Sequence, residues 1–401
     1  MNQAFIYDAI RTPRGRAKFG GGLSDMTPLQ LMDSLFAALV ERTGLDNSIV
    51  EEVVFGCVSQ VGEQGGNIAK ASLLFSKWPD HVPGLTINRY CSSGLDAINI
   101  ASMKVLTGQA KCTIAGGIEM MSRVPMLSDK AMMFSNFEFG LDHRMLMMGS
   151  GADLIASLYD ISREEADSVA FLSQKRAFEA TNQGRFKSIV PIYNPIRDTW
   201  VNSDECIREN TSMASLAEMP LAFSDLSKRG VNALQLKEHP RLDQIKHVHT
   251  AGNSPAMADA AALLLIGDEY LGETLELVPR AKIIAATSVC DDPLQVVSGC
   301  AKATKKLMDK KGLCESDIDV FELHEAFAAT SLKCQRDLDI SEKKLNVNGG
   351  CIALGHPMGA TGGIMMSTLM DELERRKSKT GIVAASGAAG SGSAILIECL
   401  Y

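Results

Sequence analysis

Three short runs of the sequence carry side chains that could perform nucleophilic catalysis together. Cys91 follows the apolar run 83–87 and precedes the periodic apolar segment 98–106, so the pattern predicts a strand, a sharp turn and a helix. A cysteine at a helix start lies among unpaired backbone N–H groups and the positive end of the helix dipole, which favour thiolate over thiol. Taken alone, however, such a cysteine is more often a small buried core residue.

Two histidines stand in settings that favour a chemical role. His324 directly follows the predicted strand 320–323, at the end of a strand where α/β sheets place functional groups. His356 lies in the glycine-rich run 346–363, where the backbone can approach a ligand closely, and Pro357 holds it on a turn. We therefore expect His356 to take the proton of Cys91, or else to polarise a thioester carbonyl, beside an oxyanion site.

A third run, 384–393, reads as a strand followed by a loop of small residues, and it includes Ser386 and Ala388. The backbone N–H groups of such a loop can face an anion. A tight glycine turn between two strands explains the same residues equally well, so both interpretations stay open.

The elements that would position these runs alternate between short apolar segments and helical patterns, which is typical of an α/β protein. The segment 44–55 resembles 312–323 at an offset of 268 residues, and Gly94 and the strand 113–115 have counterparts at the same offset. We therefore expect two halves of similar topology. The predicted strands are 4–7, 53–58, 112–115, 260–266, 282–286, 320–323, 381–385 and 394–398.

The composition changes between the halves, which predicts an inserted, loop-rich domain over residues 120–248. The N-terminal half then comprises 1–119 and 249–275, and the C-terminal half comprises 276–401. We interpret the methionines of the insert as gap-filling core in preference to an adaptable binding surface. They are Met120, Met121, Met126, Met132, Met133, Met145, Met147 and Met148.

The insert also carries five cationic residues close together in sequence. We interpret them as a solvated face, with contact to a phosphorylated ligand as the alternative. They are Lys228, Arg229, Lys237, Arg241 and Lys246.

The bulk composition fits a soluble globular protein, with 46% hydrophobic and 22% charged residues in a chain of 401. A formal net charge of −8 argues against non-specific nucleic-acid binding. The ten cysteines show no CxxC pair and no zinc-ligand spacing with the seven histidines, so we expect no metal and reduced thiols. No signal-like segment and no bilayer-length apolar run is present, so we expect a cytoplasmic protein without a membrane span.

Together these motifs resemble those of the thiolase family of acyl-CoA C-acyltransferases. The run 88–94 is similar to the nucleophile motif of the family, and 324–328 and 346–363 are similar to its histidine motifs. Segment 116–122 matches the stretch that leads into the inserted loop domain, and 250–254 matches a further motif. Because the motifs reach both ends and the middle of the chain, the resemblance covers essentially all of it.

The resemblance implies an α/β thiolase fold of two similar halves in a five-layered α-β-α-β-α arrangement with an inserted loop domain. It implies that Cys91 becomes acylated by an acyl-CoA or 3-ketoacyl-CoA, that His356 activates it, and that His324 or a water it holds helps form the oxyanion hole. Many members carry asparagine in place of His324, and the histidine form resembles thiolases of fatty-acid β-oxidation. The expected contacts to CoA, its pantetheine arm and the oxyanion are Met148, Ala251, Ser254, Ala326, Phe327 and Ala388.

Two departures from the family pattern bear on activity. Ser386 stands where the family has a second cysteine that acts as acid and base at the α-carbon of acetyl-CoA, and an aliphatic hydroxyl is a far weaker acid than a thiol. We therefore expect slow Claisen condensation and thiolysis, with acylation of Cys91 retained. In the run Ser254-Pro255-Ala256 the family usually ends in serine and glycine, and the missing hydroxyl would weaken CoA binding by about 1 kcal/mol.

The leading expectation is a 3-ketoacyl-CoA thiolase of fatty-acid β-oxidation that needs no cofactor beyond its partners acyl-CoA, acetyl-CoA and free CoA. An acetoacetyl-CoA-forming acetyl-CoA acetyltransferase shares every motif. A thiolase-like subunit with little turnover, which binds acyl-CoA or serves a partner, is the alternative from another class. The resemblance also implies a homodimer or homotetramer and allows a multifunctional β-oxidation subunit as partner.

Overall fold

The computed structural model describes residues 2–225 and 230–400 of the chain. All eight predicted strands form, and most extend beyond their predicted ends. Ten strands make one mixed sheet, β10-β11-β12-β9-β1-β8-β5-β3-β4, with β2 paired to β8. They are β1 (Phe5–Arg11), β2 (Gly15–Arg16), β3 (Glu52–Gly56), β4 (Gly84–Ile87), β5 (Cys112–Met120), β8 (Ala258–Gly267), β9 (Ala281–Cys290), β10 (Val320–Leu323), β11 (Thr380–Ser386) and β12 (Ser391–Cys399).

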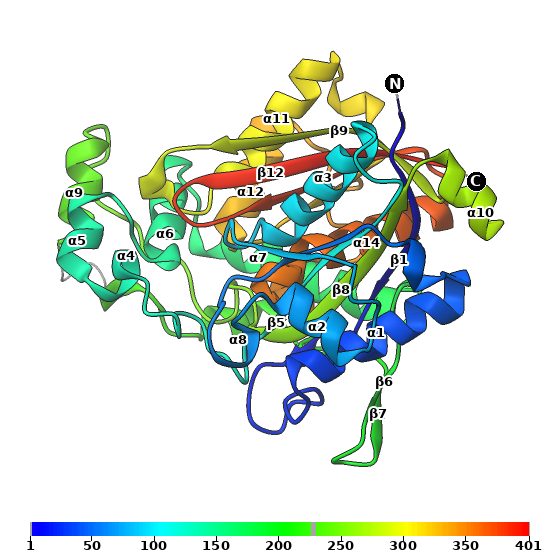
Figure 1. Cartoon of the computed structure of the whole chain (residues 1–401). Coiled ribbons are helices and arrows are strands. Elements are labelled where there is room, and N and C mark those ends of the chain that lie inside the picture. Colours follow the sequence, from blue (N-terminus) through cyan, green and yellow to red (C-terminus); the bar gives the residue numbers. More distant parts are fainter. Residues whose placement is uncertain (1, 226–229, 401) are drawn as a thin grey trace.

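The sheet consists of two halves joined by a short seam. Strand β1 meets β9 through only two residue pairs, Phe5 with Lys282 and Ile6 with Ala281, whereas β9 and β12 pair along nearly their whole length. The seam lets each half twist as a separate sheet, so the two sheets stack with helices between them (Figure 1).

Six helices complete the layers. Helices α3 (Ser93–Leu106) and α14 (Thr361–Arg376) share one apolar core with strands of both halves, so they form the middle layer. Helices α1 (Pro28–Thr43) and α2 (Ile68–Phe75) pack with the first half, and α11 (Gly299–Lys311) and α12 (Ala328–Leu338) pack with the second. The predicted five-layered arrangement is confirmed.

The internal duplication is confirmed at the predicted offset. Strands β3 and β10, helices α3 and α14, and strands β5 and β11 each begin 268 residues apart. The two glycines at this offset meet in the middle layer, because a Cβ on Gly94 would lie 2.6 Å from the Gly359 oxygen and one on Gly362 would lie 2.2 Å from the Leu95 nitrogen. Only glycine allows the first turns of α3 and α14 to approach this closely.

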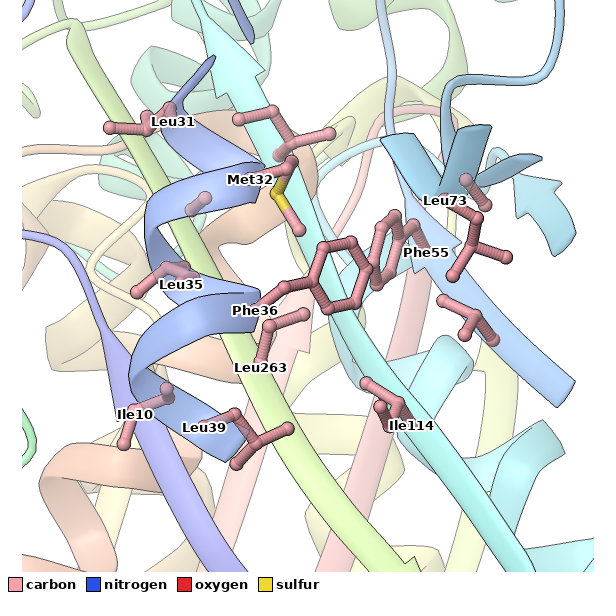
Figure 2. Packing of buried hydrophobic residues seen from close by; sticks show 14 of the residues in the cluster. Ile10, Leu31, Met32, Leu35, Phe36, Leu39, Phe55, Leu73, Ile114 and Leu263 are labelled. Carbon is pink, nitrogen blue, oxygen red and sulfur yellow. The ribbon is translucent and has the colours of Figure 1, made fainter. Parts of the chain in front are cut away.

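Helix α1 shows how local sequence and packing agree. Thr27 and Gln30 form a capping box, Pro28 opens the first turn, and the helix ends at Gly44 in the left-handed conformation. Its apolar face packs on the first half-sheet, where the rings of Phe36 and Phe55 lie 6.0 Å apart (Figure 2). Full burial of one such side chain contributes about 1.5–3 kcal/mol.

Among the described residues of the segment 120–248, predicted as the insert, Met120 alone belongs to a strand of the main sheet, as the last residue of β5. The described residues also form a separate hairpin and six α-helices, and the exact domain boundaries remain a prediction. These elements are α4 (Met132–Ser135), α5 (Phe137–Asp142), α6 (Met148–Leu158), α7 (Arg163–Asn182), β6 (Ile192–Asn194), β7 (Thr199–Val201), α8 (Met213–Ala217) and α9 (Val231–Glu238). Two short helices lie elsewhere, α10 (Glu269–Leu275) and α13 (Cys351–Leu354).

A buried ion-pair cluster ties this segment to the first half. The Asp204 carboxylate accepts hydrogen bonds from Arg11 Nη1 at 2.7 Å and from Arg14 Nη1 at 3.1 Å, and all three side chains are almost fully buried. Removing one partner of such a cluster leaves an unpaired buried charge and costs about 3–5 kcal/mol.

None of the helices in the described part of the chain has the length and apolar character needed to cross a membrane.

Candidate active site

A cavity of about 770 Å³ lies where the loops of both halves meet the inserted segment. Its volume is in the range of sites for small molecules and cofactors. Cys91, His324 and His356 all line it, although Cys91 lies more than 230 residues before either histidine in the sequence. The structure thus brings the three predicted chemical side chains to one place.

The Cys91 turn is held by its own side chains. Strand β4 ends at Ile87, helix α3 starts at Ser93, and Tyr90 between them has φ of 50°, which is uncommon for an aromatic residue. The Asn88 side chain accepts the Tyr90 N–H at 2.8 Å, and the Ser93 hydroxyl accepts the Arg89 N–H at 2.8 Å. These bonds stabilise the strained turn that presents the cysteine to the cavity.

Cys91 and His356 form a direct pair. His356 Nε2 lies 3.1 Å from Cys91 Sγ, and His356 Nδ1 lies 2.8 Å from Thr361 Oγ1. With the thiol donating to Nε2, the ring carries its proton on Nδ1 and donates it to the threonine. Thr361, the first residue of α14, therefore orients the imidazole, a role that the sequence interpretation did not assign.

The expected preference of Cys91 for thiolate is wrong for the resting site. Burial, with the nearby Glu119 carboxylate, raises the pKa of Cys91 to about 12. Burial, the neighbouring His324 and then Arg14 lower the pKa of His356 well below its usual value. The pair therefore rests as a neutral thiol and a neutral imidazole, and the proton moves only when Cys91 attacks.

His324 stands beside this pair, with the two imidazole centroids 4.4 Å apart. Its Nδ1 lies 3.2 Å from the carbonyl oxygen of Ser386, which can only accept, so the ring proton is on Nδ1. Burial lowers the pKa of His324 to about 4, so the ring is neutral and Nε2 carries a lone pair. This nitrogen can accept a hydrogen from a water, which in turn can donate to an oxyanion.

Glu119 is a buried residue of the site that the sequence interpretation missed. Its carboxylate accepts hydrogen bonds from the backbone N–H groups of Val58, Ser59 and Gly359 at 2.9, 3.1 and 3.0 Å, and from the Gln64 amide at 2.8 Å. These donors fix the loop after β3 and the turn before α14 relative to each other. The one local signal was an acidic residue at the end of an otherwise apolar strand.

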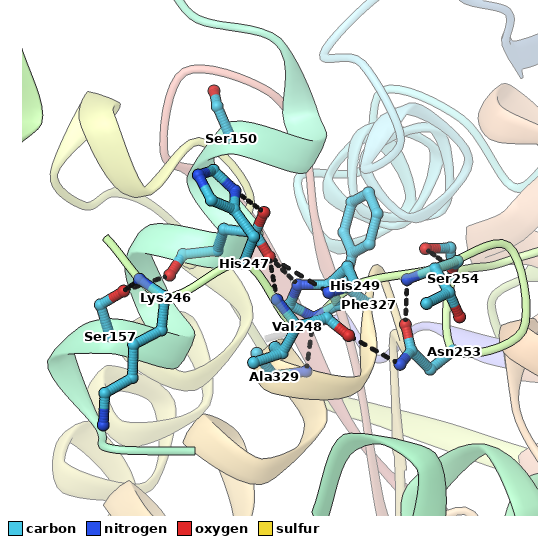
Figure 3. A network of polar contacts seen from close by, with 12 residues as sticks. Ser150, Ser157, Lys246, His247, Val248, His249, Asn253, Ser254, Phe327 and Ala329 are labelled. Atoms are coloured by element: carbon cyan, nitrogen blue, oxygen red, sulfur yellow. Dashed lines mark hydrogen bonds and ion pairs between the residues drawn. The ribbon is translucent and has the colours of Figure 1, made fainter. Parts of the chain in front are cut away.

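A second polar network fixes the loop 250–254 behind the cavity. Asp153 accepts from His249 Nδ1 and from His247 Nδ1, each at 2.7 Å, while His249 Nε2 accepts the Ala329 N–H at 3.3 Å (Figure 3). The His249 ring also packs edge-on against Phe327, with centroids 5.4 Å apart. Since Phe327 lines the cavity, this network positions part of the cavity wall.

The predicted substrate contacts divide into two groups. Met148, Ser254, Ala326, Phe327 and Ala388 line the cavity. Ala251 is exposed on the loop surface and is not among the described residues of the cavity wall. The Ser254 hydroxyl donates to the Thr250 carbonyl at 2.7 Å and so is engaged within its own loop.

Ser386 is buried, but its hydroxyl is directed away from the reacting pair. Its Oγ accepts the Cys300 N–H at 2.9 Å, at the first turn of α11, while its carbonyl accepts from His324. The side chain is not among the described residues that line the cavity.

The inserted methionines serve both as core and as cavity wall. Five of the eight line the cavity, while Met120, Met121 and Met145 are buried core residues and Met133 and Met148 pack against a core cluster. The five are Met121, Met126, Met133, Met147 and Met148. Flexible thioether side chains thus form much of the apolar wall, which suits an adaptable binding surface.

The basic cluster of the insert gains no support as a ligand site. Lys228 and Arg229 lie outside the described residues. Lys246 forms an ion pair with Asp160, which fits the interpretation of a solvated face.

Comparison with known proteins agrees with this geometry. Residues 4–270 match the family model described as "Thiolase, N-terminal domain", and residues 277–399 match "Thiolase, C-terminal domain". The chain is 37% identical to a 3-ketoacyl-CoA thiolase of Klebsiella pneumoniae and 36% identical to one of Escherichia fergusonii, over 99% of this chain and 100% of each relative. A crystal structure of the Bacillus anthracis acetyl-CoA acetyltransferase matches with a TM-score of 0.85 and 32% identity, covering 100% of this chain and 99% of that one.

Proposed function

The chain belongs to the thiolase family of acyltransferases, and from this premise we propose that it cleaves 3-ketoacyl-CoA through an acyl-enzyme on Cys91. The observation that carries the proposal is the contact of 3.1 Å between Cys91 Sγ and His356 Nε2 inside a large apolar cavity. A half-buried thiol that lines a cavity and pairs with a neutral base is an arrangement that nucleophilic acyl transfer requires.

Two chemical steps follow from this pair. In the first, Cys91 Sγ attacks the keto carbon, its proton passes to His356, and the bond to the α-carbon breaks to give the acyl-enzyme and acetyl-CoA. The α-carbon takes up a proton from water, and His356 returns its proton to the water, so the base is neutral again. In the second, the thiol of free CoA loses its proton to His356 and attacks the acyl-enzyme, and as the shortened acyl-CoA leaves, that proton returns to Cys91. A water held by His324 Nε2 would stabilise the oxyanion formed in each attack.

The direct test is a thiolysis assay with 3-ketoacyl-CoA substrates of increasing chain length. We expect consumption of the 3-ketoacyl-CoA to depend on free CoA and an acyl adduct on Cys91 in the intact-protein mass spectrum. An adduct without turnover would favour the low-turnover subunit, and no adduct with any acyl-CoA would rule out the proposal. Preference for acetoacetyl-CoA would favour the acetoacetyl-CoA-forming enzyme.

Ser386 is expected to limit the rate, because its hydroxyl is a weak acid and base and is engaged by the Cys300 N–H. We expect Ser386→Cys to raise the rate of acetoacetyl-CoA thiolysis by at least ~10-fold, since a positioned acid or base contributes about 10²–10⁴-fold. The measurement is kcat for both proteins at the same pH.

The control measurement for Ser386→Cys is the rate at which acetyl-CoA acylates Cys91, measured by mass spectrometry of the intact protein. Acylation does not use the second acid and base, so its rate should stay within about two-fold between the proteins. Equal thiolysis rates for both would show that residue 386 does not limit turnover.

Assembly into a dimer is supported by an open sheet edge. Strand β4 is the last strand of the sheet, and Leu85 on it is 36% exposed. Exposed apolar side chains also occur on the neighbouring helices, at Leu74 and Phe75 of α2 and Met103 and Leu106 of α3. An unprotected apolar edge favours pairing with a second copy. A β-oxidation role and a multifunctional partner subunit rest on the family resemblance. A cytoplasmic location is proposed from the reduced thiols that the cysteine pattern predicts.

The dimer proposal predicts that Leu85→Arg yields monomers in light scattering at micromolar concentration, because each copy would place a charge at the paired edge. Val278→Arg is the control, since Val278 is also an exposed apolar residue, at 79%, outside this set. A wild-type monomer, or a Leu85→Arg dimer, would contradict the proposal.

A further inference from the structure

Three atoms that could ligate a metal ion lie close together in the active site. One nitrogen each of His324 and His356 and the sulfur of Cys351 all lie within 4.8 Å of one another. The histidines line the cavity, and Cys351, the first residue of α13, is buried at 2% exposure. Two imidazoles and a thiol are a donor set that zinc takes in proteins.

His324 gives a second, independent indication of a ligand. Its Nε2 is buried without a hydrogen-bond partner in the described part of the chain, and such atoms are rare in folded proteins. Its Nδ1 is 3.2 Å from the Ser386 carbonyl, which fixes the proton there. Metal-bound histidines show this arrangement, with one nitrogen on the metal and the other donating to a carbonyl.

A fourth donor is within reach. Cys91 Sγ lies 3.1 Å from His356 Nε2, so the set comprises two thiols and two imidazoles. Neighbouring ligands on a tetrahedral zinc ion lie about 3.5 Å apart, given bond lengths of about 2.0–2.3 Å. Small side-chain rotations would therefore close the site around an ion.

We propose that a thiophilic divalent cation, zinc, binds His324, Cys351 and His356, with Cys91 as the fourth ligand, and thereby blocks acyl transfer. Each cysteine that binds the ion does so as a thiolate and releases one proton to solvent, while the imidazoles bind through neutral nitrogens. The bound ion occupies the nitrogen of His356 that would accept the Cys91 proton. It also occupies the nitrogen of His324 that would hold the water. Zinc would thus act as a reversible inhibitor, competing with the thioester.

Cys351 distinguishes this site from the catalytic pair, because it takes no part in the two steps of acyl transfer described above. The full-length protein is titrated with Co²⁺, whose thiolate complexes absorb light in the near ultraviolet and visible range. We expect one Co²⁺ per chain, displaced by Zn²⁺, and at least ten-fold weaker binding for Cys351→Ala. Cys112→Ala is the matched control, since Cys112 is also 2% exposed but lies at the start of β5.

A second readout is inhibition of thiolysis by Zn²⁺, expressed relative to the uninhibited rate of each protein. Acyl-CoA should protect the wild type, and Cys351→Ala should need at least ten-fold more Zn²⁺ for half inhibition. Cys351→Ser is used with the same expectation if the alanine variant does not fold. Equal Co²⁺ binding by wild type and Cys351 variants, or none up to millimolar Co²⁺, would overturn the proposal. The Co²⁺ titration needs no turnover, so it stands apart from the test of the proposed function.

Discussion

Cys91→Ala is expected to lower the rate of 3-ketoacyl-CoA thiolysis by ~10⁴-fold or more, the scale on which removal of a catalytic nucleophile acts. The reason is that Cys91 Sγ is the cavity atom on which the acyl group would be held, and His356 Nε2 at 3.1 Å is placed to accept only its proton. Steady-state kcat and the mass of the intact protein after incubation with acyl-CoA measure the loss. The adduct should vanish together with turnover.

Cys112→Ala serves as the control for this variant, because it removes a buried thiol of the first half that faces no part of the cavity wall described above. It should keep both the adduct and wild-type turnover. An acyl adduct that persists on the Cys91→Ala protein would show that another residue is the nucleophile and would contradict the assignment. Equal melting temperatures for the two variants would show that the loss is chemical.

The strands and the duplication were predictable because they depend on local pattern. Val320 to Leu323 is a mainly apolar run of strand length, with Glu322 as its one charged residue, and it begins and ends as predicted. Helices α3 and α14 follow helical periodicity. Gly94 and Gly362 could be matched by offset alone. Their reason for being glycine, the close crossing of two helices, appears only in three dimensions.

The parts of the site that sequence could not supply depend on contacts between distant segments. The four donors to Glu119 come from residues 58, 59, 64 and 359, so nothing next to Glu119 in sequence indicates them. Likewise, Ser386 could be aligned with a position of the family, but the direction of its hydroxyl depends on the packing of α11 against β11.

The protonation of Cys91 was predicted in the wrong direction for a related reason. A helix start favours thiolate when the cysteine is open to solvent, because water then solvates the negative charge. Here burial and the carboxylate of Glu119 act against the charge. The sequence shows the helix but neither the depth of the cavity nor the acid behind it.

His356→Ala is expected to reduce kcat by about 10²–10⁴-fold, the usual contribution of a positioned general base. Without the imidazole, a thiol whose pKa is raised to about 12 has no acceptor for its proton and stays un-ionised at neutral pH. Thr361→Val is a milder variant for comparison, because it removes only the 2.8 Å contact between Thr361 Oγ1 and His356 Nδ1 that orients the ring. It should lower kcat by about ten-fold and leave KM largely unchanged, as expected for loss of an interaction that acts in the transition state.

The pH profile separates this role from a merely structural one. Because the pKa of His356 in the folded protein is lowered below its usual value of about 6.5, the neutral base persists as the pH falls through 6.5. The rate of Cys91 acylation should therefore stay level from pH 8 to pH 6.5 and decline only at lower pH. As the pH falls, His324 and His356 bind protons in the unfolded chain at a higher pH than in the folded protein, where their pKa values are lowered. Their contribution to the stability of the fold is therefore full above pH 6.5 and is lost as the pH falls further. An acid limb centred at or above pH 6.5 in wild-type acylation, or a wild-type rate for His356→Ala, would show that another group accepts the proton.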